Sequence, residues 1–175
     1  MSSTAIGDST TATEYYSTAM GYLTTASGST STAMGRSTTA SGVFSTAMGN
    51  GTTASSSYST AMGRDTSASG SYSTAMGYST TASGESSIAM GLSTTASGSR
   101  STAMGHMTTA SDYASLVVGQ YNSSGFTATS AESFSTSAPA FVIGNGTSIE
   151  RSDAFKVMFN GDTNVSYDLT VSGDV

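Results

Sequence analysis

The chain contains no cysteine and no tryptophan, and it has one proline and one histidine, His106. Without cysteine, disulfide frameworks and cysteine zinc sites are impossible. Any histidine-dependent catalytic triad would have to use His106, which falls in a surface turn dipeptide. The acidic residues of the repeats are scattered over turns, with no spacing that brings two carboxylates together. We therefore expect no enzymatic activity, no cofactor and no metal site.

Charge is also scarce, because only 9% of the residues are charged. Eleven acidic residues against five basic ones give a net charge of −6, which argues against binding to nucleic-acid phosphates. No run of 18 apolar residues occurs, so no segment is expected to span a membrane. The start of the sequence has neither the basic nor the apolar region of a signal peptide. We expect neither a nucleic-acid partner nor membrane insertion for this segment.

Small residues dominate the chain. Serine (38), threonine (30), alanine (22) and glycine (20) together make up 110 of the 175 residues. Such a composition, with few large aliphatic side chains, is typical of disorder. Here it arises from a strict internal repeat, and a repeat of this kind predicts a folded, stacked architecture instead.

Glycine recurs every 14 residues from Gly7 to Gly119, and one unit reads S-T-A-M-G-x-x-T-T-A-S-G-x-x. The period is too short for a helical pair and does not fit a heptad. Each half of the unit is a five-residue extended piece followed by a turn dipeptide. Stacked coils place each strand beside its copy at about 4.8 Å. The sequence therefore predicts an all-β fold, a parallel β-roll (β-solenoid) of 14-residue coils.

Strand alternation sorts the side chains of each coil into two faces. Ser31, Ala33 and Gly35 share one face, whereas Thr32 and Met34 share the other. A two-strand coil is thin, so only the small residues fit between its sheets. The methionines then form an outward ladder of seven, and an exposed apolar ladder predicts an interface between subunits in a closed ring.

The alternation G-x-x-[TA]-x-A-x-G-x-x-S-x-A-x-G resembles the head repeat of trimeric autotransporter adhesins, the YadA-like head. That family typically carries S-V-A-I-G where this chain has Ser-Thr-Ala-Met-Gly, and residues 3–7 and 87–91 come closest. The resemblance covers about residues 3–119 in nine copies. It implies a left-handed parallel β-roll, a homotrimer of rolls side by side, and outward columns that face the trimer axis. Threonine replaces valine nearly throughout, which makes that axis more polar. The predicted trimer interface consists of Met20, Met34, Met48, Met62, Met76, Met90 and Met104.

The period breaks after Gly119, and the next glycine of the series, Gly144, follows 25 residues later. We divide the chain into a repeat head over 1–119, an insert and final coil over 120–150, and a β connector over 151–175. The connector is predicted to contain a hairpin that turns at Asn160-Gly161, and a further strand over 168–173. It resembles segments that follow such heads in long surface proteins and in phage or virus tail fibres. We therefore expect a fragment of a longer fibre.

The free turn dipeptides carry aromatic and basic side chains. Turns are where scaffolds carry binding residues, and tyrosine and arginine are enriched at interfaces. The alternative is that these aromatics pack against neighbouring turns or subunits. The predicted binding residues are Tyr22, Arg36, Phe44, Tyr58, Arg64, Tyr72, Tyr78 and Arg100.

A second outward ladder of threonine and serine barely varies between coils, although the turns do. A flat, regular threonine array resembles the ice-binding faces of repetitive antifreeze proteins. The simpler interpretation is that threonine and serine suit an exposed strand. The residues of this alternative ice face are Thr25, Thr39, Thr53, Thr81, Thr95 and Thr109.

The repeat, the ladder and the turns together predict a structural and adhesive role. We expect a rigid, trimeric, extracellular head or stalk on a bacterial cell surface or a virion fibre. Its partners would be a host cell-surface receptor, a glycan or a matrix protein. Ice binding is the alternative function.

Overall fold

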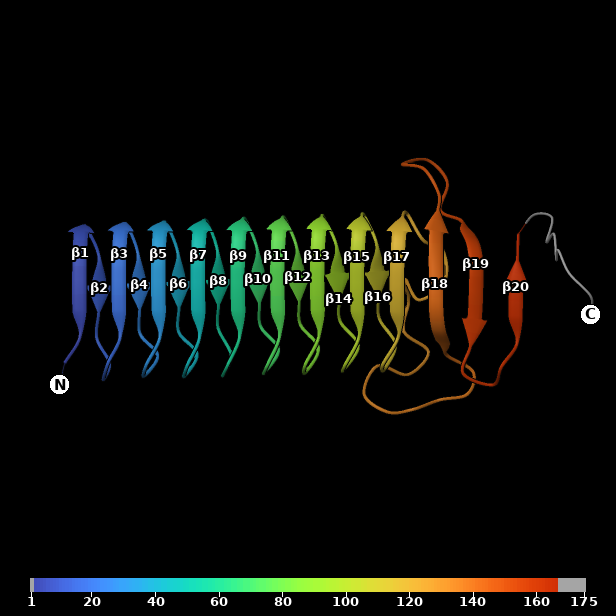
Figure 1. Ribbon diagram of the computed structural model, residues 1–175, viewed down its shortest axis with the longest axis horizontal. Coiled ribbons are helices and arrows are strands. Elements are labelled where there is room, and N and C mark those ends of the chain that lie inside the picture. Colours follow the sequence, from blue (N-terminus) through green and yellow to red (C-terminus); the bar gives the residue numbers. More distant parts are fainter. Residues whose placement is uncertain (1, 167–175) are drawn as a thin grey trace, which may run out of the picture.

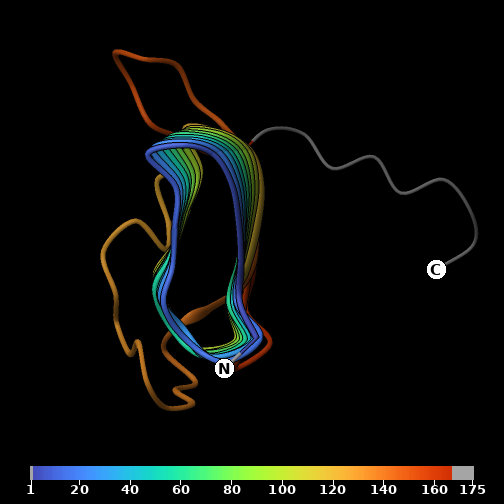
Figure 2. The same cartoon turned by 90° about the vertical axis from the view of Figure 1, so that its left-hand side faces the viewer.

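The structure is a computed structural model that describes residues 2–166, and those residues form strands and turns without a helix. Two sheets run along the repeat, and each coil contributes one strand to each of them (Figure 1). Seen along the roll, the coils superimpose into a narrow, flattened ring (Figure 2). The strand predicted over 168–173 lies outside the described residues.

The first sheet contains one five-residue strand per coil. These strands are β1 (Thr4–Asp8), β3 (Thr18–Tyr22), β5 (Thr32–Arg36), β7 (Thr46–Asn50), β9 (Thr60–Arg64), β11 (Thr74–Tyr78), β13 (Ile88–Leu92), β15 (Thr102–His106) and β17 (Leu116–Gln120). The second sheet contains two-residue strands. They are β2 (Thr11–Ala12), β4 (Thr25–Ala26), β6 (Thr39–Ala40), β8 (Thr53–Ala54), β10 (Ser67–Ala68), β12 (Thr81–Ala82), β14 (Thr95–Ala96) and β16 (Thr109–Ala110).

Each strand pairs in parallel with its copy one coil away. In the first sheet Ala33 lies opposite Ala47 and Met34 lies opposite Met48, so the register advances by one repeat per strand. A single period in the sequence thus sets the register of both sheets. The predicted all-β solenoid of 14-residue coils is confirmed.

The interior of the roll is built from small side chains. The core alanines run from Ala19 to Ala110 and are 0% exposed, and Val117 and Val142 continue the core at its C-terminal end. The inward serine and threonine columns are buried with them. The predicted assignment of small residues to the interior is confirmed in the repeats, where the inward columns consist of alanine, serine and threonine.

The second strand of each coil is shorter than the five-residue piece that the sequence predicts. The backbone N–H groups of Ser27 and Gly28 both donate to the Ala40 carbonyl, at 2.9 and 3.2 Å, so the regular ladder ends there. The chain then turns, and Ser31 N donates to Gly28 O at 3.2 Å. Glycine is required at position 28 because a Cβ there would overlap the carbonyl oxygen of Gly42 in the next coil.

Both turns of a coil place their last free residue in the left-handed region. Leu23 has a φ of 54° after the long strand, and Thr30 has a φ of 57° after the short one. The N–H groups of these residues donate to the preceding coil, to Asp8 O at 3.0 Å and to Tyr15 O at 2.8 Å. Left-handed geometry costs a non-glycine residue about 1 kcal/mol, and the hydrogen bonds to the preceding coil offset this cost.

Three further strands extend the first sheet beyond the repeats: β18 (Pro139–Asn145), β19 (Asp153–Met158) and β20 (Thr163–Val165). Strand β18 pairs in parallel with β17 and sets Gly144 opposite Gly119, whereas β19 and β20 run antiparallel. Gly161 N donates to Met158 O at 3.0 Å in the turn between the last two strands. Strands β19 and β20 thus form an antiparallel hairpin across this turn, whereas the β connector and the division of the chain at 119 and 150 stay predictions.

Candidate binding surfaces

The outer face of the first sheet carries an apolar stripe that runs the length of the roll. Met34 lies between Met20 and Met48 in adjacent strands, and the remaining methionines of the predicted ladder follow in the same column. They are half-buried by their neighbours in the single chain, and Met20 at the N-terminal end is 36% exposed. A threonine column runs beside them. The role of this stripe as a trimer interface stays a prediction.

The stripe becomes bulkier at the C-terminal end of the roll. We call this part the terminal apolar cluster; it consists of Leu116, Val118, Phe141, Ile143, Phe155 and Val157. Ile143 lies opposite Val118 on one side and Phe155 on the other, so these side chains share the outer face. Sequence reasoning missed this cluster as a functional surface. The apolar residues over 154–159 were the available signal. Only the β18–β19 register shows that Phe155 and Val157 share a face with Phe141 and Ile143.

The eight predicted turn residues fall into two columns on opposite edges of the roll. Tyr22, Arg36, Arg64 and Tyr78 each end a long strand, at the edge where the arrowheads of the first sheet lie in Figure 1. Phe44, Tyr58, Tyr72 and Arg100 occupy left-handed positions in the turns of the other edge. The structure thus divides the predicted set between two separate surfaces.

Three aromatic residues of the second edge form a stack, which we call the aromatic stack: Phe44, Tyr58 and Tyr72. Successive ring centroids lie 5.0 Å apart, at interplanar angles of 12° and 4°. The three side chains are 49%, 50% and 57% exposed. The rings stack on one another across neighbouring turns, and the three side chains remain about half exposed. Their role in binding stays a prediction.

The arginines of the turns also interact with aromatic neighbours. Their guanidinium groups lie over tyrosine rings at 5.9 Å (Arg36 and Tyr22), 5.2 Å (Arg64 and Tyr78) and 5.2 Å (Arg100 and Tyr113) from the ring centroids. Arg100 also donates to the Tyr113 hydroxyl at 2.8 Å, and Arg64 pairs with Asp65 at 3.3 Å. These cation–π pairs hold long side chains in fixed positions along both edges.

The second sheet presents one outward column of threonine, with a column of serine just beyond its short strands. Each two-residue strand presents one outward residue, so Thr25, Thr39 and Thr53 form a single half-buried column. The serine expected beside each threonine lies beyond the strand, and it is exposed at Ser41 but buried at Ser111. From Ser27 to Ser97 this serine column stays exposed or half-buried, and only at Ser111, which donates to Gly125 O of the insert, is it buried.

The described residues give no group of three or more histidine, aspartate and glutamate side chains that could hold a metal ion. His106 ends β15 and packs edge-on against Tyr121, with ring centroids 5.0 Å apart. Within the same residues, no helix is long and apolar enough to cross a membrane. That the chain is not an enzyme stays a prediction.

The insert after β17 covers the open end of the second sheet. Thr109 in the last strand, β16, is hydrogen-bonded to the side-chain amide of Asn122. The Asp112 carboxylate accepts hydrogen bonds from Thr129 N and Ser130 N at 2.5 and 2.7 Å. Both polar side chains are 0% exposed. Sequence reasoning missed this cap, although Asp112 stands where most of the coils have glycine, and that departure was a usable signal.

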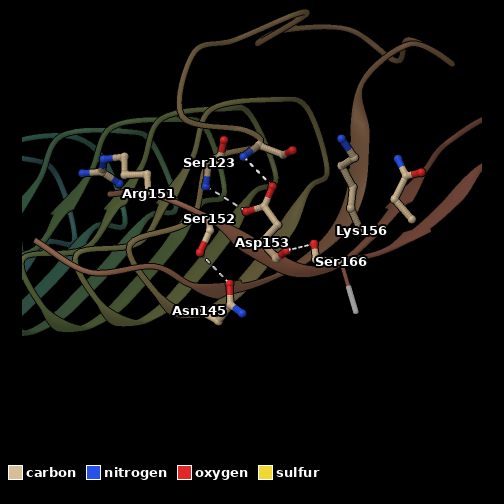
Figure 3. Close-up of a pocket in the computed structure, with 9 residues that line it drawn as sticks. Ser123, Asn145, Arg151, Ser152, Asp153, Lys156 and Ser166 are labelled. Atoms are coloured by element: carbon tan, nitrogen blue, oxygen red, sulfur yellow. Dashed lines mark hydrogen bonds between the residues drawn. The ribbon is translucent and has the colours of Figure 1, made fainter. Parts of the chain in front are cut away.

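A polar pocket of about 320 Å³ lies where the insert meets the ends of β18 and β19 (Figure 3). Its lining residues are Ser123, Ser124, Asn145, Arg151, Ser152, Asp153, Lys156, Asn164 and Ser166. The Asp153 carboxylate accepts from Ser123 N and Ser124 N, both at 2.8 Å, and Ser152 donates to Asn145 Oδ1 at 2.7 Å. Sequence reasoning did not single out this site, because its residues come from four segments without a motif.

Comparison with known families gives a match to the coils. The YadA head domain repeat, in a family model of two copies, matches residues 2–24, 26–52, 40–66, 54–80, 68–94 and 96–122. These segments cover more than half of the chain and reach the start of the insert. No curated protein matches the chain. The family match gives no support to the ice-binding alternative.

Proposed function

The chain belongs to the YadA head repeat family, and from that membership we propose that it forms part of a trimeric, adhesive surface fibre. The family suggests an adhesin-like surface protein. The proposal adds that three left-handed rolls pack side by side, outside the cell or on a virion. The observation that carries it is the apolar stripe on the outer face of the first sheet.

The stripe supports association because the roll has almost no core of its own. Its interior contains alanine, serine and threonine, and the largest apolar side chains that are fully buried are Val117 and Val142. The larger apolar residues, from Met20 to the terminal apolar cluster, lie on the outer face instead. Burying apolar area is the main driving force of association, so three such faces around one axis supply the missing core.

This arrangement leaves the rest of each roll available to partners. With the first sheet at the axis, the second sheet and both turn edges face outward. The aromatic stack and the arginine–tyrosine pairs then lie on the surface of a rigid rod, where a receptor, a glycan or a matrix protein can reach them. Fixed, half-exposed tyrosine side chains are well suited to that task, because tyrosine is prominent among residues that dominate binding energy.

The trimer is tested by placing charge on the stripe. We expect replacement of Met48, Met62 and Met76 by aspartate to dissociate the assembly, because nine carboxylates would be buried around one axis. The matched control replaces Thr39, Thr53 and Thr81 by aspartate on the second sheet, which the proposal leaves in solvent. Sedimentation velocity should give monomers for the first variant and trimers for the control. Trimers in both would contradict the proposed interface.

A further inference from the structure

We infer that the polar pocket at the insert is a binding site for a carboxylate-bearing saccharide, and that Lys156 recognises the carboxylate. The pocket lies at the C-terminal end of the roll, and none of the eight predicted turn residues lines it. It therefore adds a second site to the proposed adhesin. Because the pocket is formed within one chain, its test does not depend on the trimer or on the turns.

The position of Lys156 makes the pocket accessible in an assembly. Lys156 lies opposite Val142 in the β18–β19 register, and Val142 points into the roll. The flanking residues of β19, Phe155 and Val157, belong to the terminal apolar cluster on the opposite face. The side chain of Lys156 thus extends away from the stripe, and packing of three stripes around an axis leaves the pocket open to solvent.

The pocket gathers two of the five basic residues of a chain whose net charge is −6. Arg151 is fixed, because its guanidinium lies 4.1 Å from the Phe126 ring centroid and donates to Met107 O and Asn122 O at 3.3 and 3.2 Å. The Lys156 ammonium has no ion pair among residues 2–166. A compact ammonium of this kind is a strong partner for an anionic oxygen.

One carboxylate, that of Asp153, also lines the pocket, but its hydrogen bonds to the insert keep it from pairing with Lys156. Both oxygens of Asp153 accept backbone N–H groups, from Ser123 and Ser124, which fixes the insert to the start of β19. Figure 3 shows this carboxylate directed at the insert, with Lys156 standing apart from it. Two cations against one hydrogen-bonded carboxylate leave the pocket with a positive balance.

The shape and lining of the pocket favour a saccharide over a simple ion. A second pocket of about 320 Å³ shares Ser123, Ser124 and Lys156 with the first, so the two lie side by side; we call the pair the groove, and Lys156 borders both halves. Hydroxyl and amide groups dominate the first half, and Phe126, which is 48% exposed, lines the second. A groove of this volume accommodates a small organic ligand with many hydroxyl groups, and the Lys156 ammonium selects one that carries a carboxylate.

Isothermal titration of the whole chain tests the inference with a matched pair of sugars. The acidic probe is a tetrasaccharide of alternating glucuronate and N-acetylglucosamine, and the neutral probe is a tetrasaccharide of N-acetylglucosamine. We expect the acidic sugar to bind and Lys156→Gln to weaken it at least about tenfold, as expected for loss of a charge-assisted hydrogen bond. Lys156→Arg should retain binding. The control Ser9→Asp makes the same change in net charge at an exposed turn at the far end of the roll, and it should leave the affinity unchanged.

Three results would overturn the inference: equal binding of both sugars, unchanged affinity in Lys156→Gln, or competition by inorganic sulfate at the same concentration as the tetrasaccharide. The last result would identify a plain anion site. The melting temperature of Lys156→Gln should match that of the parent chain, because the Lys156 side chain makes no hydrogen bond within residues 2–166. If the pocket does not bind the acidic sugar, the proposed adhesin is still tested separately, by the mass of the assembly and by the dependence of attachment on the turns.

Discussion

The side-chain amide of Asn122 pairs with the backbone of Thr109 as the next strand of the sheet would. Thr109 N donates to Asn122 Oδ1 and Asn122 Nδ2 donates to Thr109 O, both at 2.8 Å. The same Nδ2 also donates to Ser124 O at 2.6 Å. A stacked β-roll must protect its last coil, because an unpaired strand edge is a template for aggregation. One buried asparagine satisfies that edge at Thr109, and Gly125 O of the insert accepts from Ser111 N beside it.

Replacing Asn122 with alanine should destabilise the chain by about 2 kcal/mol, because a buried N–H and a buried C=O of Thr109 lose their partners. Chemical unfolding gives the change, and hydrogen exchange at the Thr109 amide should speed up locally. Asn50→Ala is the control, because Asn50 is exposed at the end of β7. An equal effect of the two substitutions would mean that Asn122 does not act as a cap.

Replacing Thr30 with glycine should stabilise the chain by about 1 kcal/mol. Thr30 is β-branched and has a φ of 57°, a geometry that glycine adopts without cost. The matched control is Thr32→Gly, two residues later inside β5, where ordinary strand geometry makes glycine destabilising. The two variants should therefore move the melting temperature in opposite directions, and a shift in the same direction would contradict the turn geometry.

Attachment should depend on the aromatic stack. We expect the double substitution Tyr58→Ser and Tyr72→Ser to weaken binding to host cells or to an immobilised glycan or matrix protein, because it removes two half-exposed tyrosines from one edge. The control is Tyr22→Ser with Tyr78→Ser on the opposite edge. Comparison of the two double variants identifies the edge that binds. Full attachment by both variants would contradict the proposal that turn residues bind the partner.

The sequence predicts the roll well because one period fixes several features at once. The 14-residue spacing sets the parallel register, and alternation within S-T-A-M-G then decides that Ala33 points inward and Met34 outward. The length of the second strand in the same coil could not be predicted in this way. The second strand stops after Ala26, because Ser27 and Gly28 share the Ala40 carbonyl, and residue types alone do not indicate such a shared hydrogen bond.

The surfaces at the C-terminal end could not be predicted in the same way. The cap joins Asn122 to Thr109 across the end of a sheet, and no repeat unit contains that contact. The terminal apolar cluster depends on an antiparallel register with an irregularity between Ile143 and Gly144. The pocket around Lys156 combines an insert with residues of three strands, β18, β19 and β20. Each of these features arises from tertiary contacts between segments that share no pattern.

The mass of the chain in solution tests the central claim most directly. Light scattering on the purified, unsubstituted chain needs no assumption about its ligand or its origin. One chain has a mass of 17.4 kDa, and the proposed assembly of three predicts about 52 kDa, three times that value. A species of 17.4 kDa at micromolar concentration, with the apolar stripe of every roll left in water, would contradict the account.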